Sequence, residues 1–147
     1  MRKLLRTGNS GTPAILRLVL GFVIFAHGSQ KMLGWFGGQG FSATMHRFTT
    51  YMHIPAPFAF LAIAAEFFGG IGLVIGLLTR VAAFGILVNM LVAIFKVHLH
   101  FGLFANWAGT QKGEGIEFHL LVLAIATCLM INGGGACSID RRLAGGR

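Results

Sequence analysis

The chain has 147 residues, of which 55% are hydrophobic and only 11% are charged, and its formal net charge is +8 at pH 7. Soluble domains carry about 25% charged residues, so this composition, with a mean hydropathy of +0.76, indicates one integral membrane domain over residues 1–147. The two cysteines form no C-x-x-C motif, which disfavours a dithiol relay or a thiolate metal cage, and no basic-aromatic pattern indicates nucleic-acid binding.

The first apolar segment, residues 13–33, follows a short basic stretch but lacks a cleavage site and precedes further apolar segments, so it is predicted to be a retained membrane helix. Arg17 near its inner end is expected to extend to the cytoplasmic headgroups. His27 and Lys31 are four residues apart and share a helix face, with Gln30 beside them.

The glycine-rich and aromatic loop after this segment is too polar to span a membrane. We expect a short interfacial helix near residues 43–52, with Trp35 and Trp107 as anchors at the membrane surface.

The second segment, residues 57–78, carries Glu66 near its middle. An ionisable group in lipid costs about 2.5–3.5 kcal/mol or more, so this carboxyl must be neutral, paired or turned to a polar cavity. Small residues four apart predict a packing face beside it. By depth along the helices, Glu66 could contact either His27 or Lys31. The two alternatives for such a contact are a functional polar pocket and a buried pair that only holds the helices together.

The third segment, residues 79–98, ends with Lys96 and His98, and Asn89 lies on nearly the same face as Lys96. His98 and His100 point in different directions on a continuous helix, which disfavours a metal site, and we predict none. The fourth segment, residues 116–131, begins with Glu117, which suits the helix dipole but could also join Lys31, Lys96 and His98 in one outer cluster.

The basic residues alternate between segment ends in a pattern that predicts four spans with both termini in the cytoplasm. They precede the first segment, occupy the second connection at Arg80 and follow the fourth segment. The fold class expected is therefore an all-α, four-transmembrane-helix bundle.

Several motifs resemble the DoxX family of bacterial integral membrane proteins. They are AHGSQKMLGWFGG at residues 26–38, AEFFGGIGLVIGLLTR at 65–80, MLVAIFKVHL at 90–99, the Glu117–Phe118 pair and SID at 138–140. The resemblance implies a multi-pass protein of the inner membrane, related to subunits of a terminal quinol oxidase and of a thiosulfate:quinone oxidoreductase. Lys96 and His119 depart from the usual pattern of the family. The residues that match it are His27, Gly28, Lys31, Glu66, Gly69, Gly70, Arg80, His98 and Glu117.

The first functional hypothesis is a quinone-linked oxidoreductase or its membrane subunit. Glu66 and His27 would be the catalytic residues, and the headgroup would be bound by Lys31, His98, Glu117, Gln30 and Lys96. No haem, flavin or metal motif is recognisable, so electrons would pass through the quinone or a redox partner subunit. The alternatives are a non-enzymatic scaffold that recruits a redox or stress-response partner and, third, a small-solute or proton transporter, for which a homo-oligomer could supply the path.

Overall fold

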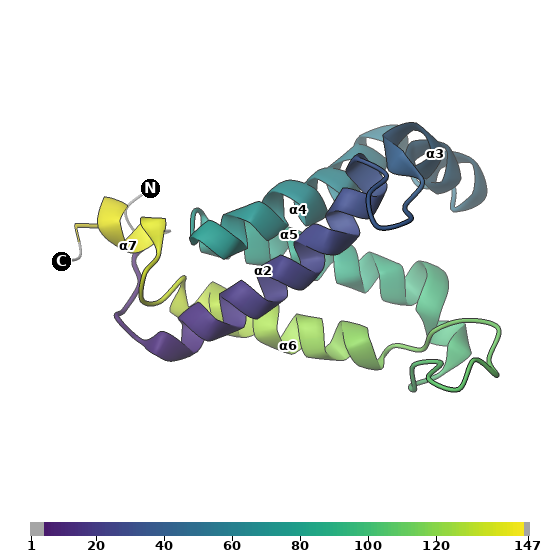
Figure 1. The fold of residues 1–147 in the computed structure, drawn as a ribbon. Helices are drawn as coiled ribbons and strands as arrows, with labels where there is room; N and C mark the ends of the chain where they lie inside the picture. The colour runs from purple at the N-terminus through teal and green to yellow at the C-terminus, as the bar shows by residue number, and fades with distance from the viewer. Residues whose placement is uncertain (1–4, 146–147) are drawn as a thin grey trace.

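The computed structural model describes residues 5–145, which are helical with irregular connections and contain no strand. Four helices form the body of the molecule: α2 (Gly11–Met32), α4 (Ala56–Ile75), α5 (Thr79–Ala93) and α6 (Glu117–Asn132). Figure 1 shows α2 and α4 running side by side, α5 behind them, and α6 beneath, with both chain ends at one end of the bundle.

Shorter elements complete the chain. The short helix predicted near residues 43–52 is present as α3 (Gly40–His46) and a π-helical turn, η1 (Arg47–Tyr51), and its place at the membrane surface stays a prediction. Helix α5 continues through a second π-helical turn, η2 (Ile94–His98), into a 3-10 turn, η3 (Leu99–Phe101), and the chain closes with α7 (Ile139–Leu143).

Three helices are long and apolar enough to cross a membrane, namely Gly11–Met32, Ala56–Ile75 and the continuous stretch Thr79–Phe101. Helix α6 is also apolar but has 16 residues. At 1.5 Å per residue it extends about 24 Å, which is less than the roughly 30 Å of a hydrocarbon core.

The apolar side chains divide between a packed interior and an apolar exterior. Ile24, Leu73, Ile86 and Leu129, from the four main helices, are 0 or 1% exposed. Large side chains on the outer faces of the same bundle stay uncovered: Phe22, Phe68, Phe95 and Leu121 are 60–71% exposed. A soluble protein does not maintain so broad an apolar exterior, whereas a lipid-facing surface requires it.

Glycines bring α2 and α4 into backbone contact. A Cβ on Gly21 would lie 2.8 Å from the Cβ of Leu73, and one on Gly70 would lie 2.6 Å from the backbone nitrogen of Phe25. Real Cβ atoms do not approach this closely, so these positions require glycine for the observed packing. The predicted glycine face is therefore present, and Gly70 is the member that meets α2.

The end of the bundle that holds the termini is closed by polar caps on the helix ends. Arg17 is 2% exposed, and its guanidinium donates to the carbonyl oxygens of Leu73 and Val74 at the end of α4 and of Gly134, Ala136 and Cys137. The expectation that Arg17 extends to the headgroups is wrong, because carbonyls at the end of α4 and in the loop 133–138 surround its guanidinium instead.

Two further side chains cap helices at this end. The Asp140 carboxylate accepts hydrogen bonds from the backbone N–H groups of Leu78 and Thr79, at 2.7 and 2.8 Å, and so caps the start of α5. Arg80 donates to the carbonyls of Met130 and Ile131, which end α6. Arg17, Asp140 and Arg80 thus cap the end of α4, the start of α5 and the end of α6, respectively.

Candidate functional site: a charged cluster across three helices

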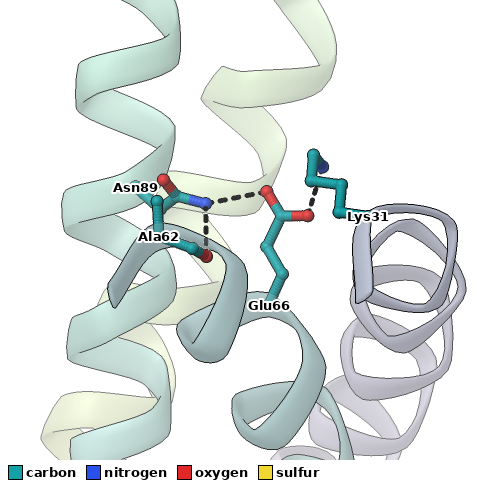
Figure 2. Close-up of polar contacts among 4 residues, drawn as sticks. All are labelled: Lys31, Ala62, Glu66 and Asn89. Atoms are coloured by element: carbon teal, nitrogen blue, oxygen red, sulfur yellow. Dashed lines mark hydrogen bonds and ion pairs between the residues drawn. The ribbon is translucent and has the colours of Figure 1, made fainter. Parts of the chain in front are cut away.

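Glu66 lies on α4 with 4% of its surface exposed, and both of its carboxylate oxygens have partners from other helices. Figure 2 shows Oε2 paired with the Lys31 ammonium of α2 and Oε1 accepting a hydrogen bond from the Asn89 amide of α5, at 2.7 Å. The Asn89 amide is also 3.4 Å from the carbonyl oxygen of Ala62, one turn before Glu66. The three side chains, hereafter the Lys31–Glu66–Asn89 cluster, connect α2, α4 and α5.

The Lys31 ammonium reaches Glu66 because α2 and α4 touch immediately below it. A Cβ on Gly28 would lie 2.5 Å from the backbone nitrogen of Phe67 and 2.7 Å from the carbonyl carbon of Glu66. Lys31 follows Gly28 by three residues and therefore projects from the same side of α2. The side chain of Lys31 is 27% exposed, against 6% for Glu66, so the cluster is accessible from the lysine side.

His27 does not take part in this cluster. Its ring is exposed and lies 5.9 Å, centroid to centroid, from Phe118 at the start of α6. Of the two contacts that the sequence allowed for Glu66, the structure therefore contains the one with Lys31.

Two other candidate residues have separate surroundings. The Gln30 amide donates to the backbone carbonyl of Phe36, at 3.2 Å, which fastens the loop after α2. Lys96 is exposed on η2, and its side chain forms no hydrogen bond or ion pair with any residue from 5 to 145. The binding roles expected for these two side chains remain predictions.

A histidine pair lies at the end of the bundle opposite the termini. The rings of His98 and His119 are 4.1 Å apart, centroid to centroid. His98 Nδ1 is 2.8 Å from the Glu114 carbonyl oxygen, which can only accept, so this nitrogen carries the proton. His119 is 7% exposed, and its Nδ1 has no hydrogen-bond partner in the described structure.

The loop before α6 engages Glu117. The Trp107 indole donates to Glu117 Oε1 at 2.9 Å, and the nearby Glu114 carboxylate accepts from the backbone nitrogen of Asn106. Glu117 therefore braces the loop between η3 and α6, and its assignment to a ligand site is still a prediction.

Asn89 and His119 were not among the residues selected from the sequence. Asn89 belongs to the cluster because each oxygen of the buried Glu66 carboxylate needs a donor, and the Asn89 amide serves Oε1. A search for amides at the depth of Glu66 would have identified it. The contact of His119 with His98 depends on how α6 faces the continuation of α5, which the sequence does not show.

The described residues include no group of three or more His, Cys, Asp or Glu side chains that could hold a metal ion. The change from π to 3-10 geometry after His98 does not bring His100 to it, since the His100 ring packs on Phe101 instead. Two open surface pockets lie elsewhere. One is lined by α3 and η1 residues, including His46 and Tyr51, and the other lies at the end that holds the termini.

The apolar exterior, the three spanning helices and the buried charged cluster define a helical membrane protein. Comparison with known families gives the more particular assignment: the model of the DoxX family matches residues 12–99, and the chain belongs to this family. An uncharacterized protein of Haemophilus influenzae is 30% identical over 138 residues, which is 88% of each chain. No solved structure matches this chain.

Proposed function

We propose that this protein is the quinone-binding membrane component of a redox system, with its headgroup and proton site at the Lys31–Glu66–Asn89 cluster. The observation that carries the proposal is an ion pair held between helices inside an apolar bundle, with the lysine partly exposed. Ionisable residues at such depth mark ligand or proton pathways by default.

The donor set fits a quinone. A quinone has two carbonyl oxygens that accept hydrogen bonds, and when bound it would supply the electron-carrying group that the chain itself lacks. The Lys31 ammonium can donate to such an oxygen from its exposed side. The Glu66 carboxylate can take up or release a proton, and Asn89 holds Glu66 Oε1 in place. Phe67 and Phe68, next along α4, are in edge-to-face contact and offer an apolar wall. A redox partner subunit would complete the electron path.

In this proposal α6 is a fourth span and both termini are cytoplasmic, in the bacterial inner membrane. The support is the distribution of charge: Arg80 contacts the Arg6 carbonyl and the end of α6, and Arg141 and Arg142 lie on α7, which Figure 1 shows beside the chain ends. A short α6 can span if the bilayer thins around it or flanking residues extend the apolar length. A cysteine introduced at position 142 should resist labelling from outside intact cells, whereas efficient external labelling would refute this orientation.

A second candidate function is a scaffold that recruits a redox or stress-response partner without binding quinone. The observation that favours it is the complete pairing of the carboxylate, since Glu66 Oε2 has Lys31 and Oε1 has Asn89. A paired carboxylate is all that a structural role requires.

The test is the quinone content of the protein purified in mild detergent. We expect quinone near one molecule per protomer for the wild type and its loss in Glu66→Gln and Lys31→Ala. Lys112→Ala is the matched control, because Lys112 is an exposed loop lysine remote from the cluster, and it should retain quinone. Wild-type protein with no more quinone than the bulk lipid would favour the scaffold.

A further inference from the structure

The pocket at the end that holds the termini combines two arginines with one large apolar side chain, Ile131. Its volume is about 550 Å³, and it is lined by Arg6, Thr7, Gly8, Arg80, Ile131 and Asn132. None of these six residues is acidic. The pocket lies at the level where α5 begins and α6 ends, because Arg80 is the second residue of α5 and Ile131 the second-last of α6. It therefore opens where a membrane span meets the headgroup layer.

The shape of the pocket is set by backbone and hydroxyl contacts. The Thr7 hydroxyl donates to the Asn132 carbonyl at 3.3 Å and accepts from the Gly135 nitrogen at 2.7 Å, which fastens the amino-terminal segment across the end of α6. The Arg80 guanidinium also donates to the carbonyl of Arg6. Since Arg80 also donates to the carbonyls of Met130 and Ile131, its position is fixed and it contributes positive charge to the pocket rather than a mobile donor.

Arg6 is the adaptable part of the pocket. Its side chain is exposed, and its guanidinium forms no hydrogen bond or ion pair in the described structure. The acidic residue of α7, Asp140, directs both of its oxygens to the backbone N–H groups of Leu78 and Thr79. The positive charge of the pocket is therefore not neutralised by that carboxylate.

We propose that this pocket binds the phosphate group of an anionic phospholipid. Guanidinium groups match phosphate oxygens in geometry and charge, and basic pockets between membrane helices recognise anionic headgroups. Ile131 is 70% exposed beside the two cations, so the site is apolar toward the acyl chains and basic toward the headgroup. This amphipathic lining fits a phospholipid rather than a free phosphate ion, and the proposal does not depend on quinone binding.

The test compares Arg6→Gln with Arg142→Gln, which removes an exposed arginine from the same end without touching the pocket. Native mass spectrometry would count phosphatidylglycerol retained by each protein after mild delipidation. We expect one tightly retained lipid in the wild type and in Arg142→Gln. Its affinity should fall about fivefold in Arg6→Gln, the equivalent of about 1 kcal/mol per basic residue near the surface.

Two further measurements distinguish a phospholipid headgroup from a free phosphate ion as the ligand. Phosphatidylcholine should be retained far less than phosphatidylglycerol, and inorganic phosphate should not displace the lipid. Equal losses in Arg6→Gln and Arg142→Gln would mean diffuse attraction to the basic end and would overturn the site. Displacement of the lipid by inorganic phosphate would also overturn the proposal, because the pocket would then select the anion alone. Detergent unfolding of both variants controls for lost structure.

Discussion

Gly28 and Phe67 are in backbone contact: a Cβ on Gly28 would lie 2.5 Å from the Phe67 nitrogen. This contact lies directly beside Glu66 and fixes the distance from which Lys31 reaches it. The charged cluster is therefore a consequence of close helix packing, and the glycine is as much a part of the site as the charged residues.

Gly28→Ala should consequently destabilise the protein and separate Lys31 from Glu66. Overpacking by one methyl group costs about 1–3 kcal/mol. Gly11→Ala is the control on the same helix, because nothing lies within 4 Å of its Cβ position, and it should leave stability unchanged or slightly raised. Unfolding midpoints in mixed detergent micelles would measure both. Equal midpoints for the two variants would contradict the close approach of α2 and α4.

The Lys31–Glu66 pair should show strong coupling in a double-mutant cycle. Lys31→Met leaves a carboxylate buried with only Asn89, and Glu66→Gln leaves the ammonium without its counter-charge. Each single variant should lose about 1–3 kcal/mol, below the range for fully buried pairs because Lys31 is 27% exposed.

In the same cycle the double variant should recover part of this loss, since no unpaired charge remains. Additive effects in the unfolding free energy would show that the two side chains do not interact in the membrane. The result is independent of quinone, so it separates the existence of the pair from its function.

Much of the fold follows from the apolar runs. The segment predicted at residues 57–78 is observed as Ala56–Ile75, and the one predicted at 116–131 as Glu117–Asn132. The ends differ for local reasons. Gly76 adopts a left-handed conformation, with φ of 70°, and stops α4 three residues before the apolar run ends. Helix α5 continues to Phe101 through η2 and η3, because its polar last turn still forms helical hydrogen bonds.

The site was less predictable than the fold. Periodicity and depth along the helices allowed a contact of Glu66 with either His27 or Lys31, and the structure contains the one with Lys31. Periodicity does not show which neighbouring helix a face meets, so Asn89 and the His98–His119 contact were missed. Arg17 was misread for a related reason: a cation near a span end usually reaches water, but here the end of α4 and the loop 133–138 close around it.

Arg17 should therefore be essential for stability. Arg17→Met would remove the guanidinium that donates to the carbonyls of Val74, Gly134 and Cys137, and each unsatisfied buried group costs about 1–3 kcal/mol. Arg17→Lys should rescue little, because a single ammonium cannot span acceptors on two segments. Arg142→Met, at an exposed arginine of the same end, is the control and should unfold like the wild type. Full rescue by lysine would indicate that only the charge at position 17 matters.

The last prediction concerns half-buried Asn89 and buried His119, which were not among the candidate site residues and should respond in opposite ways to the same substitution. Asn89 donates to Glu66 Oε1 and lies near the Ala62 carbonyl, so Asn89→Leu should cost about 1–3 kcal/mol of unfolding free energy. His119 buries an Nδ1 that has no partner in the described structure, so His119→Leu removes an unsatisfied group and should leave stability unchanged or raise it. Paired unfolding measurements would settle both. Destabilisation by His119→Leu comparable to that of Asn89→Leu would contradict the description of His119 Nδ1 as a group whose burial costs stability.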